Sequence, residues 1–199
     1  TTFLDVVAFL GNFVSDGLDF AIEERTQKLQ DLIWAGKYEN GDKKEKNKLA
    51  DKFELAIEAS IPIAIQSKFS NIVYETIRYE LSVGFNDKTK ENAVLSEKVL
   101  LIKQSSSKNF NKPQQDLFPF PIKPPKTILT QTPVKLGERL IVKKNEVGKV
   151  NFYSETYKTA SKGWMPAYRL GERKSALGNL PEDEKNFPAT TWLKSLLAE

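Results

Sequence analysis

Residues 53–61 decide the fold, and they read Phe53-Glu54-Leu55-Ala56-Ile57-Glu58-Ala59-Ser60-Ile61, with apolar side chains at every second position. A period of two places successive side chains on opposite faces of a β-strand, so the stretch predicts a strand with one buried face. The same alternation recurs at 77–83, and 93–104 is apolar enough for a strand buried on both faces. Three neighbouring strands with short links predict an antiparallel meander within 52–104.

The residues before this sheet have the period of helices. Thr1 and Thr2 open a segment whose apolar residues recur three and four positions apart, which places them on one helix face. Gly17 marks the end of that helix, and a second amphipathic stretch follows at 18–33. We therefore expect helices over 1–36, followed by an exposed charged loop at 37–51.

The second half of the chain is less regular. Residues 105–138 hold more than half of the ten prolines and predict an irregular Pro-rich insertion, because proline fits neither a helix interior nor a central strand. Residues 139–157 predict a hairpin that turns at Gly148. Residues 158–199 predict a loop-rich segment that ends in the start of a helix near Thr190. The whole chain predicts one α+β unit in which N-terminal helices pack on an antiparallel β-subdomain.

Composition excludes several chemistries. The 199 residues contain neither Cys nor His, which removes disulfides, thiol catalysis, the commonest zinc ligand and the His-containing triads. The net charge of +4 is too small to indicate nucleic-acid binding without clustering. No apolar run approaches the roughly 20 residues of a membrane helix. We expect a cytoplasmic protein with no membrane partner.

The paired hydroxyls at the chain start have two chemical interpretations. In a P-loop, a glycine-rich turn and a Lys precede one or two Ser or Thr residues that open a helix, and the first hydroxyl ligates Mg²⁺. Thr1 and Thr2 followed by an apolar helix fit the second half of that motif. Alternatively, Thr1 is a mature N-terminus whose own amine activates its hydroxyl as a nucleophile.

A family resemblance supports the first interpretation. The opening Thr-Thr-Phe-Leu-Asp-Val-Val-Ala-Phe-Leu resembles the helix after the phosphate loop in ABC-type ATPase heads, which include the structural-maintenance-of-chromosomes, RecF-like and related AAA family ATPases. Residues 25–36 are similar to the arginine and leucine-rich segment of those heads. The alternating strands, with Tyr79-Glu80-Leu81 and Glu97-Lys98-Val99-Leu100, resemble their β-subdomain. The resemblance covers about residues 1–104, and more loosely 139–157.

The resemblance implies ATP and Mg²⁺ as ligands of a larger ATPase. Thr1 would ligate Mg²⁺, Thr2 would contact a phosphate, and Arg25 would approach nucleotide or DNA. The intact protein would form a homodimer around nucleotide and act on DNA or on a partner effector protein. The P-loop Lys, a Walker B strand and the signature motif are not in this sequence. The chain is therefore expected to be the N-terminal lobe fragment that starts just after the P-loop Lys, and to be inactive alone.

Two alternatives remain open. The N-terminal-threonine hydrolase requires Thr1 on a strand with a Lys and an Asp nearby, whereas residues 3–14 have helical period. A non-catalytic interaction module would use the prolines at 112–133 as a polyproline II ligand. Glu54 and Glu58 lie on one strand face and are interpreted as its solvent side.

Overall fold

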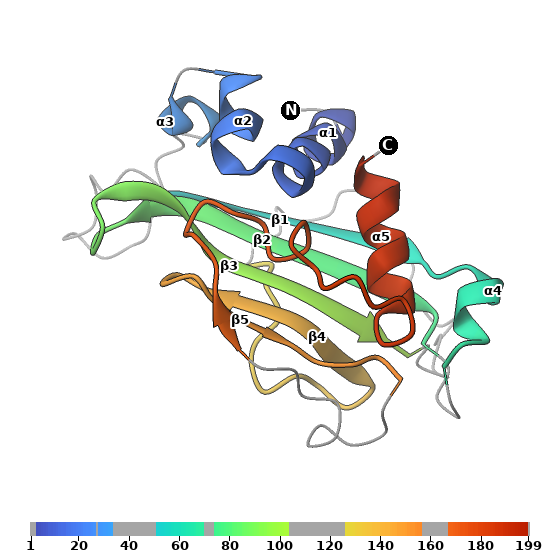
Figure 1. Cartoon of the computed structure of the whole chain (residues 1–199). Helices are drawn as coiled ribbons and strands as arrows, with labels where there is room; N and C mark the ends of the chain where they lie inside the picture. Colours follow the sequence, from blue (N-terminus) through green and yellow to red (C-terminus); the bar gives the residue numbers. More distant parts are fainter. Residues whose placement is uncertain are drawn as a thin grey trace, which may run out of the picture.

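The computed structural model describes residues 3–26, 28–33, 51–69, 74–103, 126–156 and 167–198. It confirms an α+β fold, in which helices from both ends of the chain cover one face of an open six-stranded antiparallel sheet (Figure 1). The predicted charged loop and the larger part of the Pro-rich insertion lie outside the described residues. Within the described ranges, no helix is long and apolar enough to cross a membrane.

The N-terminal layer consists of helices α1 (Phe3–Asp16), α2 (Leu18–Glu23) and α3 (Leu29–Leu32). Gly17 separates the first two with a φ of 95°, a value that glycine adopts without strain. The prediction of one helical stretch over 18–33 was wrong, because the chain leaves the helix after α2. The physical reason is the polar run 23–28, which offers no apolar side chain that a continuing turn could bury.

The sheet is a meander in which every strand pairs with the next one along the chain. Its register aligns Leu55 with Leu81 and Tyr79 with Val99, so the apolar sets of β1, β2 and β3 share the face beneath the helices. The predicted strands and the 139–157 hairpin are confirmed, and Gly148 turns the hairpin with a φ of 75°. The strands are β1 (Lys52–Ser60), β2 (Thr76–Asn86), β3 (Glu91–Ile102), β4 (Glu138–Asn145), β5 (Lys149–Phe152) and β6 (Tyr168–Arg169).

Two short elements were not predicted from the sequence. Helix α4 (Ile63–Gln66) follows β1 as a single turn, and β6 adds two residues to the far edge of the sheet. Both are too short to produce a periodic pattern. The predicted helix start near Thr190 is confirmed as α5 (Pro188–Ala198).

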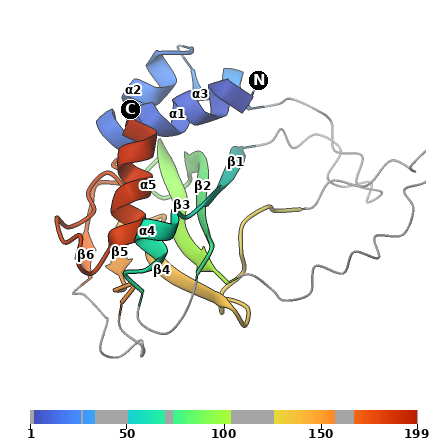
Figure 2. The same cartoon turned by 90° about the vertical axis from the view of Figure 1, so that its right-hand side faces the viewer.

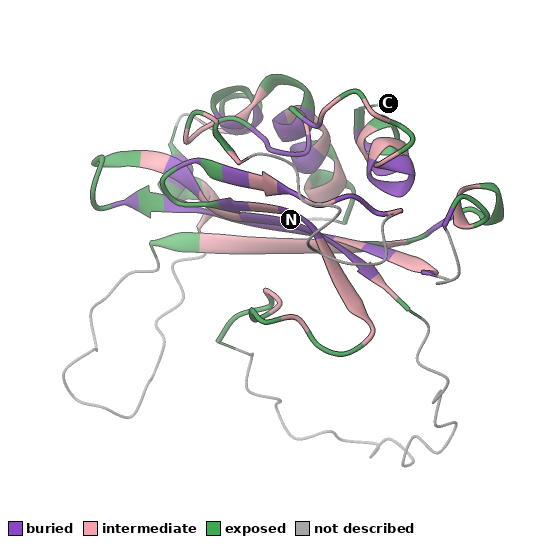
Figure 3. Cartoon of the chain, turned by 60° about the horizontal axis from the view of Figure 1, so that its bottom comes forward, coloured by how far each residue is buried: buried purple, intermediate pink, exposed green. Residues whose placement is uncertain are grey.

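The core lies between the sheet and the helix layer (Figure 3). Helix α1 contacts the edge strand through Phe9, whose ring stands edge-on to Phe53 with 5.6 Å between centroids. Helices α1 and α5 meet at Gly11, where an added Cβ would lie 2.5 Å from the carbonyl oxygen of Leu197. Gly11 therefore permits the close crossing that fixes α1 beside the C-terminal helix.

Candidate functional site

The first turn of α1 is the candidate nucleotide-binding position. Thr1 and Thr2 lie outside the described residues, and the helix begins immediately after them at Phe3. The side chains of Phe3 and Leu4 are about three-quarters exposed, at 74% and 75%, so this end of the helix is open to solvent. The first N–H groups of any helix have no partner within the helix, and they carry partial positive charge that favours anions. Asp5 is the acidic residue of this turn, and its negative charge disfavours the binding of a further anion there.

Arg25 is held against the same turn, although 20 residues separate it from Asp5. One guanidinium nitrogen donates to the backbone oxygen of Asp5 at 3.4 Å, and the other donates to the backbone oxygen of Ala21 at 3.1 Å. The guanidinium also lies over the ring of Phe9, 5.4 Å from its centroid. The structure thus places the predicted cation beside the start of α1, against the backbone of Asp5 and the ring of Phe9. The positions of the two threonines relative to Arg25 are not described.

The described residues offer no other metal site. They contain no group of three or more Asp or Glu side chains arranged to hold a metal ion.

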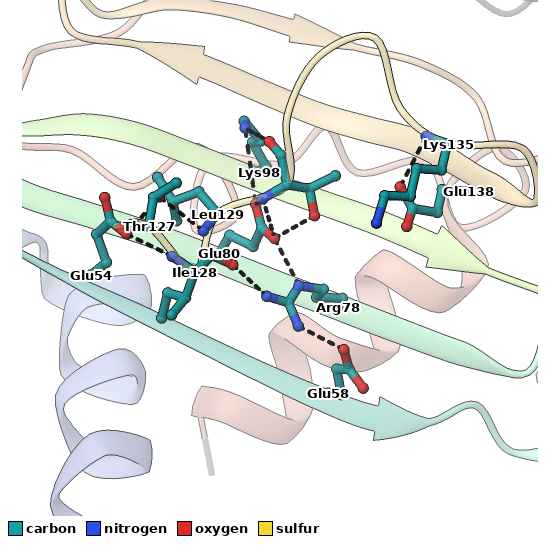
Figure 4. Close-up of polar contacts among 11 residues, drawn as sticks. Glu54, Glu58, Arg78, Glu80, Lys98, Thr127, Ile128, Leu129, Lys135 and Glu138 are labelled. Carbon is teal, nitrogen blue, oxygen red and sulfur yellow. Dashed lines mark hydrogen bonds and ion pairs between the residues drawn. The ribbon is translucent and has the colours of Figure 1, made fainter. Parts of the chain in front are cut away.

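The outer face of the sheet, opposite the helices, carries a network of charged side chains (Figure 4). Its centre is Glu80 of β2, which is 1% exposed and accepts from the Arg78 side chain at 2.7 Å. The backbone N–H and the hydroxyl of Thr130 donate to the same carboxylate, and Lys98 lies 3.9 Å from it. Burial lowers the pKa of Lys98, and the Glu80 charge opposes that shift. Glu80 thereby fixes the segment 126–137, which we call the strap, across the sheet (Figure 3).

Glu54 fixes the start of the same strap. Its carboxylate accepts from the hydroxyl of Thr127 at 2.7 Å and from the N–H of Ile128 at 3.0 Å, and its side chain is only 11% exposed. The interpretation of Glu54 as solvent-facing was therefore wrong, because the strap covers it. Glu58 is half exposed, at 51%, and pairs with Arg78. Burial raises the pKa of Glu54, but the hydrogen bonds from Lys52, Thr127 and Ile128 outweigh it and leave that pKa lowered.

The inner face holds a fully buried pair of opposite charges, Glu97 of β3 and Lys144 of β4, which lie opposite each other in the register. Glu97 accepts from the Tyr79 and Ser175 hydroxyls at 2.9 Å each, and from the N–H groups of Ala176 and Leu177 at 2.7 and 2.9 Å. Burial raises the pKa of Tyr79 well above its ordinary value, and the Glu97 charge adds to the shift.

Lys144 binds backbone carbonyl groups of the segment that also contributes N–H groups to Glu97, residues 171–177. Its ammonium donates to the backbone oxygens of Gly171, Glu172 and Lys174. Burial lowers the pKa of Lys144, whereas the Glu97 and Glu172 charges raise it. The two side chains together anchor residues 171–177 on the sheet, one through backbone N–H groups and the other through backbone C=O groups. Their role is structural, since hydrogen-bond partners within the protein occupy both.

A third buried carboxylate caps α5. Glu155 is 2% exposed and accepts from the N–H groups of Ala189 and Thr190 at 2.8 Å each, and also from the Thr190 hydroxyl. These N–H groups belong to the first turn of α5, where a negative charge is favourable. Burial nevertheless raises the pKa of Glu155.

A shallow hollow of about 600 Å³ lies at the other end of α1. Arg173 lines it, accepts the N–H of Leu18 on its backbone oxygen, and pairs with Asp19 and Glu91. The hollow is therefore remote from the first turn of α1, and Arg173 in its lining already has acidic partners. We do not assign it a role in nucleotide binding.

Comparison with known proteins returned no match: no family profile, no curated protein and no solved structure is significantly similar to this chain.

Proposed function

We propose that the chain is part of the nucleotide-binding lobe of an ABC-type ATPase of the AAA family, which binds and hydrolyses ATP with Mg²⁺. The observation that carries the proposal is the exposed first turn of α1, which directly follows two threonines and lies against Arg25. A helix start with adjacent hydroxyls and a nearby cation has the chemistry needed to hold phosphate and magnesium.

In this proposal Thr1 ligates Mg²⁺ and Thr2 contacts a phosphate oxygen. Arg25, which lies against the first turn of α1, is the residue that approaches the nucleotide or DNA. The nucleotide with its metal supplies the bond that is hydrolysed, and these residues bind and orient it. The described residues supply no general base in this turn other than Asp5, whose carboxylate is exposed.

The order of elements supports the same proposal. Helices followed by an antiparallel sheet are what the resemblance to the ATPase heads implies, and the chain has that order. We propose further that the active protein is a homodimer around nucleotide, located in the cytoplasm, which acts on DNA or on a partner effector protein.

The two alternatives have less support. A terminal threonine nucleophile requires a strand at Thr1, and α1 begins at Phe3. The interaction module relies on the Pro-rich segment 112–133, of which residues 112–125 lie outside the described residues.

The codons before Thr1 provide the first test. The proposal predicts a Gly-x-Gly-Lys sequence directly upstream, whereas a pro-segment that ends in an autoprocessing Gly would support the hydrolase. A start codon directly before Thr1 would contradict both. For the 199-residue chain alone we predict no ATP turnover, and turnover that survives Thr1→Ala and a repeated purification would refute the proposed role of Thr1.

A further inference from the structure

The segment that leads from β6 to α5 begins at the edge of the sheet opposite β1 (Figure 2). Its first turn, residues 171–174, is closed by the N–H of Lys174, which donates to the carbonyl oxygen of Gly171 at 3.1 Å. This turn lines the hollow of about 600 Å³, and Thr89 and Glu91 from the β2–β3 connection and the start of β3 line it as well. The hollow therefore brings together two parts of the chain that are distant in sequence.

The backbone of this turn presents N–H groups outward. The carbonyl oxygens of Gly171 and Glu172 accept from the buried ammonium of Lys144 at 3.1 and 3.2 Å, so they point into the protein. In a trans peptide the C=O and N–H groups point in opposite directions, and the N–H groups of Glu172 and Arg173 therefore point away from Lys144. Within the described part of the chain, neither N–H donates to a protein acceptor. Successive outward N–H groups in a turn are suited to binding an anion.

Two cationic side chains that line the hollow have no acidic partner among the described residues. Arg169 donates its Nε to the backbone oxygen of Val147 at 3.2 Å, which leaves both terminal nitrogens of its guanidinium available. The stem of Lys174 lies beside Gly171, where an added Cβ would be 3.8 Å from its Cγ. Both side chains are exposed and can therefore reach a ligand in the hollow.

The acidic side chains of the hollow are already engaged by protein donors. The carboxylate of Glu172 accepts from the side chain of Asn86 at 3.3 Å and from the hydroxyl of Thr89 at 3.0 Å. Glu91 pairs with the guanidinium of Arg173 at 3.3 Å. The lining holds three basic and two acidic side chains, so its remaining charge is positive and favours an anion.

We propose that the hollow binds the phosphate group of a small soluble molecule. The N–H groups of Glu172 and Arg173 donate to its oxygens, and the side chains of Arg169 and Lys174 neutralise its charge. A phosphate fits these donors better than a carboxylate does, because it offers more acceptor oxygens and up to two negative charges. This site does not rest on the proposed nucleotide site, which lies at the other end of α1.

The test titrates inorganic phosphate into the 199-residue chain at constant ionic strength and without Mg²⁺, followed by backbone NMR. We expect saturable shifts of the amides of Glu172 and Arg173 at millimolar phosphate, and much smaller shifts with acetate. Absence of saturable shifts at these amides would overturn the proposal. Equal responses to phosphate and acetate would overturn the assignment of the ligand as a phosphate.

Two charge-removing variants test the side chains. Arg169→Gln and Lys174→Gln should each weaken phosphate binding at least threefold, and the double variant at least tenfold. The matched control Lys185→Gln loses the same charge at an exposed position outside the hollow and should bind phosphate like the unmodified chain. Equal weakening by all three single variants would show general electrostatic attraction and would refute a built site.

Two further measurements separate this site from other sources of phosphate binding. Thr1→Ala should leave the phosphate-induced shifts unchanged, whereas their loss would place the phosphate at the start of α1 and overturn the proposal. Vesicles that contain phosphatidic acid present the same phosphate group on a membrane. We expect them to leave these amides unshifted, and shifts with vesicles but not with free phosphate would replace the soluble molecule with a lipid.

Discussion

The buried pair Glu97 and Lys144 gives the strongest stability prediction, tested by Glu97→Leu. The substitution leaves four donors without their acceptor: the Tyr79 and Ser175 hydroxyls and the N–H groups of Ala176 and Leu177. An unsatisfied buried donor costs about 1–3 kcal/mol, and the hydroxyls can reorient while the N–H groups cannot. The change also removes one of the two negative charges, those of Glu97 and Glu172, that favour the buried Lys144 ammonium. The two N–H groups alone therefore cost about 2–6 kcal/mol, and we expect the free energy of unfolding to fall by an amount in that range.

A double-mutant cycle with Lys144→Met separates the charge interaction from the lost hydrogen bonds. We expect the double variant to be more stable than the sum of the two single effects by at least about 1 kcal/mol, because each single variant leaves one buried charge without the opposite charge across the register and the double variant removes both. The assay is urea unfolding followed by tryptophan fluorescence.

Glu91→Leu, at the exposed end of the same strand, is the matched control and should change stability by less than about 1 kcal/mol. A cost below about 1 kcal/mol for Glu97→Leu, or simple additivity in the cycle, would refute the assignment of the pair as the anchor of residues 171–177.

Three further predictions address the helix caps, the helix crossing and the strap. Burial raises the pKa of Glu155, so the stability that this side chain contributes is present below about pH 4.3 and is lost as pH rises through the raised pKa. The urea midpoint of the unmodified chain minus that of Glu155→Gln should therefore fall as pH rises over this range. A difference that stays constant or rises would contradict this prediction. Gly11→Ala should lower the free energy of unfolding by about 1–3 kcal/mol, because the added Cβ meets Leu197 and this outweighs the higher helix propensity of alanine. The control Gly171→Ala should not lower it, because the nearest atom to its added Cβ is 3.8 Å away. A thermal melt in which Gly11→Ala gains stability would refute the close crossing. Thr130→Val should accelerate proteolysis within the strap and destabilise by about 1.5–3 kcal/mol through the lost hydrogen bond to Glu80, while Thr89→Val should not; equal cleavage rates would show that Glu80 does not hold the strap.

Periodicity was sufficient to predict the main elements. The 3.6-residue spacing of Leu10, Phe13 and Val14 placed them on one face of α1, and all three are buried. Phe3 was predicted on the same face and is 74% exposed, whereas the buried Phe9 was not predicted there. The alternation in 53–61 and 77–83 gave the strands and their inner faces. Both signals depend only on neighbouring residues, and for that reason they could be read without knowledge of the fold.

The polar contacts depend on residues distant in sequence and were not predicted. Glu97 lies on the inner face between apolar neighbours, and a charge there indicates a buried partner, but Ala176 and Leu177 are some 80 positions away. Glu54 has the alternation of a solvent-facing residue, and only the strap determines that it is covered. For the candidate site, Arg25 stays a prediction from the family resemblance, while its contact with Asp5 required the folded arrangement of α1 and α2.

The central claim, that the start of α1 binds Mg-ATP, is tested most directly by titrating nucleotide into the whole protein of which residues 1–199 are proposed to be a part. Binding of a non-hydrolysable ATP analogue is measured by calorimetry with and without Mg²⁺, for the unmodified protein and for Thr1→Ala. We predict binding that strengthens at least tenfold with Mg²⁺, and a loss of that magnesium dependence in Thr1→Ala. Absence of binding, or a magnesium dependence that Thr1→Ala leaves unchanged, would contradict the proposed function.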